Sequence, residues 1–320
     1  MKRTNRIALM FVAAALYLTP IEGRAGQELW VYSSLYKEVA AAIEAAFEKR
    51  YPHIDVKTFQ AGSEKLQAKI EAEQTAGRLQ ADILLTSDPF WGLVLDQRGL
   101  LLDRKDRKAV ETNYYSLMVL VAHRNLDPSK RPTSFMDLQS PSFRGIVQMG
   151  SPLESGTTYS TVAHLSEKYG WKYFEQLRAN GIAAAGGNST VIQKVETGEK
   201  KVGIVLLENA LAAIKRGSPL EVIYPQDGGI LIPSVQMIFK DTRNKQAAEL
   251  FADFMLGDEA QLIMTKGFIY SVLRHVPSPE GAKSLAEVMK DSPLWTPTFL
   301  VKAATESKDI KKKFSHLILE

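Results

Sequence analysis

Hydroxyl side chains recur where the sequence predicts that a strand ends and a helix begins. The clearest case is Ser155-Gly156-Thr157-Thr158, which follows a short apolar stretch and opens a predicted helix through Lys168. The first N–H groups of a helix have no partner within it, and the positive end of the helix dipole lies there. Such a corner can hold an anion, although Ser and Thr are also ordinary N-caps.

The same pattern occurs at four more predicted strand-to-helix corners. If both halves of the chain turn the carboxyl ends of their strands toward one cleft, hydroxyls and free amides converge there. That environment suits a phosphate, phosphonate or carboxylate, and the alternative is that all five corners are routine caps. The four corners are Ser33-Ser34, Gly62-Ser63, Ser87-Asp88 and Asn188-Ser189-Thr190.

Two acidic residues complete the predicted site. Glu208 ends an apolar strand, where its side chain could bind a hydroxyl or amino group of a ligand or simply favour the start of the next helix. Asp227 belongs to a Gly-rich turn whose backbone can approach the cleft closely. The predicted ligand-binding residues are therefore Ser33, Ser34, Ser63, Ser87, Ser155, Gly156, Thr157, Thr158, Ser189, Glu208 and Asp227.

Motifs of catalysis and of metal or cofactor binding are absent from the sequence. The five histidines are scattered, and neither HExxH, GxSxG, a Walker A loop nor GxGxxG occurs. Tyr114-Tyr115 could supply two phenolates for ferric iron, but neighbouring side chains of a strand point to opposite faces, which predicts one core and one surface residue. We predict no catalytic residue, no metal ligand and no cofactor.

The first 25 residues have the features of a secretory signal peptide. A basic start is followed by the apolar run Ile7 to Ile21 and by small residues that predict a cut after Ala25. The alternative, an uncleaved membrane anchor, is disfavoured because the run is short for a bilayer. Cleavage lowers the formal charge from +4 to +1, so nothing indicates a nucleic-acid partner. Export without any cysteine, and hence without a lipid anchor on one, predicts a free periplasmic protein, which we expect to be a monomer.

Strands and helices alternate along the chain, which predicts parallel sheets with right-handed crossovers. Apolar strands at Tyr114 to Ala122 and Ser234 to Phe239 are candidate crossings between two lobes. We predict a two-lobed α/β fold with a mainly parallel sheet in each lobe and a ligand cleft between them. Lobe 1 would hold residues 26–120 and 234–280, and lobe 2 residues 121–233 and 281–320.

The sequence resembles the type II periplasmic solute-binding proteins of ABC importers that are related to ferric-iron binders. The resemblance implies a receptor that closes its lobes around a ligand by a hinge and then docks on an inner-membrane permease. It spans most of the chain after residue 25. Its marks are Leu29-Trp-Val-Tyr-Ser33, Ala81-Asp82 with Ser87-Asp88, Phe143-Arg-Gly145, Ser155-Gly156-Thr157, Gly198-Glu199 with Val202-Gly203-Ile204, and Tyr224-Pro225 with Asp227-Gly228.

The chain departs from the iron-binding relatives at their metal ligands. Those relatives carry adjacent tyrosines just after an asparagine, whereas Asn209 is followed here by Ala210 and Leu211, and the histidine expected near residues 31–34 is absent. The departures favour the branch that resembles receptors for sugar phosphates, phosphoglycerate or 2-aminoethylphosphonate. The predicted function is capture of a small phosphorylated or phosphonate organic anion. A ferric-iron receptor and a secreted enzyme on a two-lobed α/β fold are the alternatives.

Overall fold

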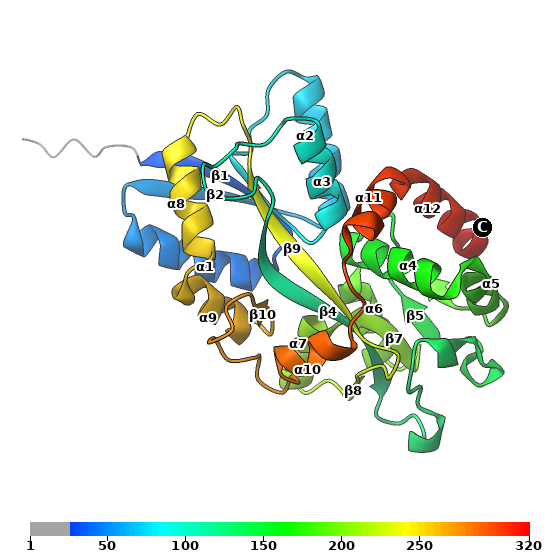
Figure 1. The fold of residues 1–320 in the computed structure, drawn as a ribbon. Coiled ribbons are helices and arrows are strands. Elements are labelled where there is room, and N and C mark those ends of the chain that lie inside the picture. Colours follow the sequence, from blue (N-terminus) through cyan, green and yellow to red (C-terminus); the bar gives the residue numbers. More distant parts are fainter. Residues whose placement is uncertain (1–25) are drawn as a thin grey trace, which may run out of the picture.

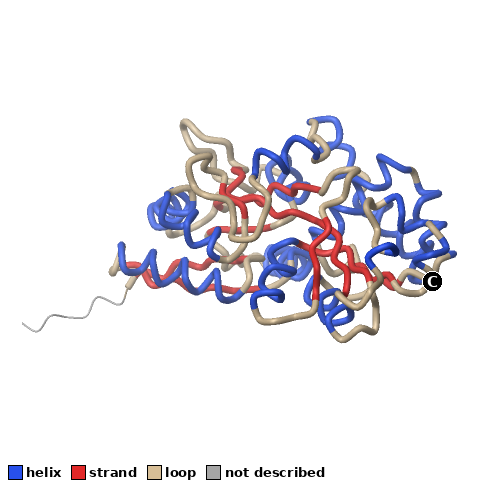
Figure 2. The backbone as a smooth tube through the Cα atoms, turned by 90° about the horizontal axis from the view of Figure 1, so that it is seen from below, coloured by secondary structure: helices blue, strands red, loops and turns tan. Residues whose placement is uncertain are grey.

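Two long strands, β4 (Glu111–His123) and β9 (Ile230–Ile238), cross the centre of the structure and belong to both lobes (Figure 1). The structure is a computed structural model and describes residues 26–320. Its strands form one sheet in the order β2-β1-β3-β9-β4-β7-β5-β6, with β8 and β10 paired to β4 beside this path. Figure 2 shows helices on either side of the strands as they pass from one lobe into the other. The predicted two-lobed α/β fold is confirmed.

Lobe 1 is built on three parallel strands joined by helices. Because β3 is buried along its whole length, it forms the centre of this lobe, and antiparallel β9 pairs with it. The free edge of β2 is covered by α1, whose Glu48 accepts a hydrogen bond from the backbone N–H of Val56 at 2.8 Å. The elements are β1 (Gln27–Ser33), α1 (Lys37–Arg50), β2 (Ile54–Gln60), α2 (Ser63–Thr75), β3 (Ile83–Thr86), α3 (Pro89–Gln97), α8 (Lys245–Met255), α9 (Asp258–Lys266) and β10 (Tyr270–Ser271).

Lobe 2 repeats the parallel pattern on the other side of the central strands. Strand β7 pairs with β5 in parallel and with β4 in antiparallel orientation, and it is buried throughout. The elements are β5 (Val147–Met149), α4 (Gly156–Tyr169), α5 (Trp171–Ala179), β6 (Ala183–Ala184), α6 (Asn188–Glu196), β7 (Val202–Leu206), α7 (Leu207–Lys215) and β8 (Leu220–Ile223). Short 3-10 turns at Pro128–Lys130, Met136–Gln139 and Pro141–Phe143 lead from β4 to β5.

The C-terminal segment consists of several short helices. It forms α11 (Pro297–Thr305), α12 (Ser307–Phe314) and a last π-helical turn at Ser315–Leu319, after α10 (Leu285–Asp291). Helix α11 packs on α3, while α12 packs on α4 (Figure 1). The C-terminal helices therefore contact elements of both predicted lobes, and the sequence-based lobe boundaries stay predictions.

Residues 1–25, where the signal peptide is predicted, lie outside the described residues. From residue 26 to the C-terminus, no helix is both long and apolar enough to cross a membrane.

A glycine in lobe 2 yields a prediction about packing. A Cβ added to Gly203 would lie 2.7 Å from Cγ1 of Val191 on α6 and 3.0 Å from Cγ2 of Val121 on β4. We expect Gly203→Ala to lower the free energy of unfolding by about 1–3 kcal/mol in urea denaturation, because the packed core cannot yield freely. In a Val191→Ala background, where the nearest methyl is gone, the same substitution should be less destabilising. Equal effects in the two backgrounds would contradict this account.

Candidate functional site

The amino ends of helices from both lobes meet around a cavity of 450 Å³ between the lobes. Lobe 1 contributes the starts of α1 and α2 and the turn before α3, and lobe 2 contributes the starts of α4, α6 and α7. This is the carboxyl edge of the parallel strands, where ligands of such sheets bind. The lining residues are Ser34, Leu35, Tyr36, Lys37, Glu38, Gln60, Gly62, Ser63, Ser87, Tyr114, Ser116, Glu154, Ser155, Gly156, Thr157, Gly187, Asn188, Ser189, Leu206, Glu208 and Ile269.

On the lobe 1 side of the cavity, hydroxyl groups form a connected chain. Oγ of Ser34 lies 3.1 Å from Oγ of Ser87, which lies 3.2 Å from the hydroxyl of Tyr114. The backbone N–H of Ser87 also donates to Oγ of Ser34 at 3.0 Å. The chain fixes the positions of the oxygens, while each hydroxyl hydrogen can rotate to suit a ligand.

The lobe 2 side has a matching chain. Oγ of Ser155 lies 3.0 Å from Oγ1 of Thr157, which accepts a hydrogen bond from Nδ2 of Asn188 at 3.0 Å. Oδ1 of Asn188 accepts in turn from the backbone N–H of Leu206 at 3.2 Å. The starts of α4, α6 and α7 are thus linked by one hydrogen-bonded network.

The lobes are in close contact at Gly156, the first residue of α4. A Cβ added there would lie 2.9 Å from Cβ of Ser63 on α2 and 3.0 Å from Cβ of Asp88, the N-cap of α3. Such distances leave no room for any side chain at this position. Glycine therefore allows the starts of the two helices α2 and α4 to approach each other across the cleft.

Asp88 is a buried carboxyl at this contact. It caps α3 by accepting a hydrogen bond from the backbone N–H of Trp91 at 3.0 Å. Burial raises its pKa to about 6, although that hydrogen bond acts in the opposite direction. Asp88 does not line the cavity, so its role here is to fix the start of α3.

Glu208 is the one buried carboxyl that lines the cavity. Its Oε1 accepts a hydrogen bond from Oγ of Ser116 at 2.7 Å, and no described basic side chain forms an ion pair with it. Burial raises the pKa of Glu208 to about 7, and the bond from Ser116 only partly opposes this. Near neutral pH the group can therefore act as a hydrogen-bond donor or as an acceptor.

Tyr36, at the start of α1, connects lobe 1 to α7 of lobe 2 near Glu208. Its hydroxyl donates a hydrogen bond to Oδ1 of Asn209 on α7. Burial, followed by the nearby Glu208 carboxylate, raises the pKa of the Tyr36 phenol well above its ordinary value. The pKa of the Tyr114 phenol is also raised, mainly by burial. Both phenols are therefore neutral at physiological pH.

Most of the predicted ligand-binding residues lie together at this cavity. Three do not line it. Oγ of Ser33 accepts from the backbone N–H of Leu35, and Thr158 is buried against Gly150. Asp227 accepts from the backbone N–H groups of Phe135 and Met136 and from the hydroxyl of Tyr169, so it caps a 3-10 turn instead. The residues that line the cavity are Ser34, Ser63, Ser87, Ser155, Gly156, Thr157, Ser189 and Glu208.

The predicted ligand-binding residues leave out Tyr36, Gln60, Ser116 and Asn188, although Asn188 lies in one of the predicted corners. The sequence predicts that the pair Tyr114-Tyr115 gives one core and one surface residue, without saying which. Tyr114 is indeed buried, but its hydroxyl also belongs to the lobe 1 chain. Three of the helices that begin at the cavity also lack the hydroxyl N-caps that the sequence predicts. Helices α1, α2 and α6 have Tyr36, Gly62 and Gly187 at the N-cap and no side-chain cap.

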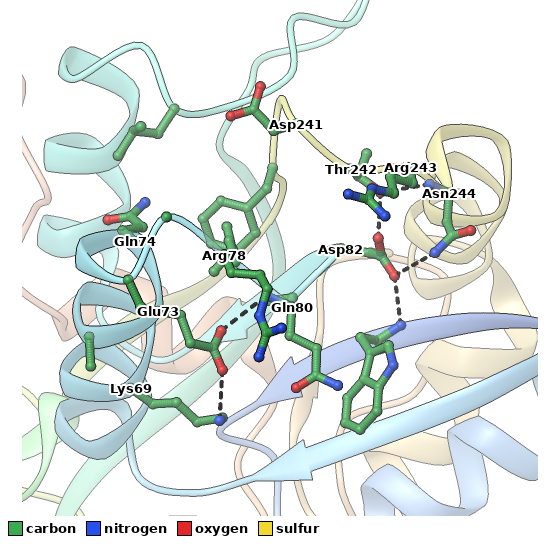
Figure 3. A pocket seen from close by; sticks show the side chains of 18 of the residues that line it. Lys69, Glu73, Gln74, Arg78, Gln80, Asp82, Asp241, Thr242, Arg243 and Asn244 are labelled. Carbon is green, nitrogen blue, oxygen red and sulfur yellow. Dashed lines mark hydrogen bonds and ion pairs between the residues drawn. The ribbon is translucent and has the colours of Figure 1, made fainter.

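A larger depression of 1090 Å³ lies on lobe 1 at the opposite edge of the sheet (Figure 3). Two of its carboxyl groups, those of Asp82 and Glu73, already bind neighbouring residues. Asp82 accepts from the backbone N–H of Trp30 at 2.8 Å and from Nδ2 of Asn244 at 3.1 Å, while Glu73 pairs with Lys69 at 2.7 Å. We therefore favour the smaller cavity between the lobes as the functional site.

Residues 29–268 match the family described as bacterial extracellular solute-binding protein. The chain belongs to this family. A protein of Haemophilus influenzae with no assigned function is 27% identical over 82% of this chain and 83% of its own length. The phosphoglycerate transport regulatory protein PgtC of Salmonella typhimurium is 24% identical over 59% of this chain. That match spans about half of PgtC, 52% of its length.

Solved structures with the same fold include periplasmic binding proteins. AfuA from Actinobacillus pleuropneumoniae, with bound fructose 6-phosphate, has a TM-score of 0.79 and 24% identity over 92% of this chain and 99% of AfuA. Iron-bound HitA from Pseudomonas aeruginosa has a TM-score of 0.77 and 22% identity over 90% of this chain and 99% of HitA. This solute-binding protein therefore has the fold of receptors with quite different cargo.

The raised pKa of Glu208 predicts how the stability of this solute-binding protein depends on pH. The folded state holds the proton more tightly than the unfolded chain, so the free energy of unfolding falls as pH rises from about 4.5 to about 7. We expect Glu208→Gln to remove about 3 kcal/mol of this fall, measured by urea denaturation across the range. Glu154→Gln, at an exposed carboxyl of the same cavity, should follow the wild type. Parallel curves for wild type and Glu208→Gln would contradict the prediction.

Proposed function

We propose that this solute-binding protein is the periplasmic receptor of an ABC importer for a small organic anion that carries a phosphate or phosphonate group. The anionic group would lie in the cavity, beside the starts of α2 and α4, and Glu208 would bind the rest of the molecule. The observation that carries the proposal is the meeting of uncapped helix starts and hydroxyl chains at one cavity. The protein family implies both a small solute and a permease partner.

The free donors at the cavity favour an anion. Helices α1, α2 and α6 begin there without side-chain caps, so their first N–H groups are available to a ligand. Oγ of Ser63 and Oγ of Ser189 have no hydrogen-bond partner among the described residues. Aligned N–H groups and the helix dipole together stabilise negative charge.

Among the charged residues that line the cavity, Glu38 and Glu154 are exposed and Glu208 is buried, so an anion would be bound by the neutral donors. Lys37 is the single basic residue among those that line it, and its side chain is exposed. The anion would then be held without a buried ion pair that is costly to desolvate. A cavity of 450 Å³ lies within the ordinary size range of small-molecule sites and can enclose a sugar phosphate or a smaller solute.

Relatives give independent support for this cargo. PgtC is named for phosphoglycerate transport, and the AfuA structure contains fructose 6-phosphate. Both are similar to this chain over a large part of its length, although their identities are low enough for the cargo to differ. The proposal therefore rests first on the cavity.

Ferric iron is the competing cargo, because Tyr36, Tyr114 and Glu208 all line the cavity. Two phenolates and a carboxylate could coordinate this ion. Each phenol, however, has a raised pKa and is already hydrogen-bonded, Tyr36 to Asn209 and Tyr114 to Ser87. Within residues 26–320, no three His, Cys, Asp or Glu side chains are grouped to hold a metal.

Isothermal titration calorimetry tests the proposed cargo directly. We expect at least one of fructose 6-phosphate, glucose 6-phosphate, 3-phosphoglycerate and 2-aminoethylphosphonate to bind with one-to-one stoichiometry. Ferric citrate should produce no tyrosinate-to-iron absorption band. Binding of iron with that band, together with no heat from any phosphorus compound, would contradict the proposal.

A single hydroxyl tests where the anion lies. We expect Ser63→Ala to weaken binding of the best phosphorus compound by at least about tenfold, since a hydrogen bond to a charged group is lost. The thermal stability of the unliganded protein should hardly change, because Oγ of Ser63 has no partner in the protein. Ser166→Ala, on α4 but outside the cavity, is the matched control. Unchanged affinity in Ser63→Ala would place the anion elsewhere.

A further inference from the structure

A C-terminal lysine reaches across the junction of the two lobes. Nζ of Lys311, on α12, lies 2.7 Å from each carboxylate oxygen of Glu64, on α2. Both side chains are largely withdrawn from solvent, with 15% and 16% of their surfaces exposed. Glu64 directly follows Ser63, so this ion pair lies next to the cavity without lining it.

The two partners belong to different hydrophobic cores. Helix α12 is anchored in lobe 2, where its Phe314 packs on Phe174 of α5 with ring centroids 5.7 Å apart. Helix α2 is anchored in lobe 1 through Leu66 and Ile70. A movement of α12 with lobe 2 away from α2 would carry the ammonium of Lys311 away from the Glu64 carboxylate, and it would also separate α11 from α3 of lobe 1.

The surroundings of Lys311 hold its ammonium at the junction. Nζ lies 4.9 Å from the centre of the Tyr159 ring on α4, a cation–π contact. Asp88 is close enough for its pKa to be lowered by Lys311 and raised by Glu64, besides the dominant effect of burial. One cation thus faces two carboxyl groups of lobe 1, beside the close contact at Gly156.

We propose that Lys311 is a positioning residue for lobe closure, which stabilises the closed arrangement by pairing with Glu64 across the cleft. Its contribution does not depend on the identity of the ligand. A ligand that binds only the closed form has a higher apparent affinity when a larger fraction of the protein is closed. The ion pair would therefore increase the affinity for the ligand without touching it. Salt should weaken the effect only modestly, since both side chains are largely withdrawn from solvent.

Distances between spin labels test this proposal in the full mature chain. The chain has no cysteine, so labels can be placed by Ala68→Cys on α2 and Gln193→Cys on α6, both at exposed positions. In the unliganded protein, pulsed electron–electron double resonance should show a population in which the two labels have the separation that this structure gives for residues 68 and 193. We expect Lys311→Met to reduce that population about tenfold and Lys311→Arg to retain it. High salt should modestly reduce the population in the wild type but not in Lys311→Met.

Two further variants separate closure from folding. Lys312→Met removes an exposed charge one residue along α12 and should behave as the wild type. The double variant Glu64→Gln/Lys311→Met removes both charges of the ion pair and leaves Asp88 hydrogen-bonded to the backbone of α3, so it should fold as judged by circular dichroism and still lack the closed population. An unliganded wild type without that population would overturn the proposal. So would a Lys311→Met protein whose distances match those of the wild type.

Discussion

The contact at Gly156 is the constraint on which the arrangement of the site depends. Any side chain at this position would meet Ser63 and Asp88, so only glycine lets α4 begin against the starts of α2 and α3. Everything proposed for the cavity follows from this approach. It brings the free N–H groups of α2 near the hydroxyls at the start of α4, and it brings α12 within reach of Glu64.

The electrostatic character of the cavity explains how it could hold an anion and release it again. Its donors are hydroxyls and backbone amides fixed by their own hydrogen bonds, and its one buried carboxyl has a pKa near neutrality. A permanent cation at the centre would have to be desolvated at high cost and would bind any anion strongly. The charged groups instead lie beside the cavity, where Lys311 and Glu64 act on the separation of the lobes and not on the ligand.

The alternation of apolar strands with helices predicts the fold, and the hydroxyl residues between them predict most of the cavity. Buried strands such as β3 and β7 have continuous apolar sequences, and the Ser87-Asp88 corner directly follows β3. What could not be predicted depends on contacts between distant segments. Tyr36 and Tyr114 differ from core tyrosines only because their hydroxyls face the cleft. The sequence around Asp227 does not reveal that its carboxylate binds Phe135 and Tyr169. Lys311 lies in a run of lysines whose composition indicates only a solvated helix face.

The most direct test of the central claim is a crystal structure of the protein with the phosphorus compound that it binds best. The account predicts the phosphorus atom in the cavity beside the starts of α2 and α4, with its oxygens within hydrogen-bonding distance of Ser63 and of the hydroxyls of Ser155 or Thr157, and the rest of the ligand toward Glu208. An anomalous signal from iron between Tyr36 and Tyr114 would contradict it. So would a ligand whose phosphate contacts one lobe alone.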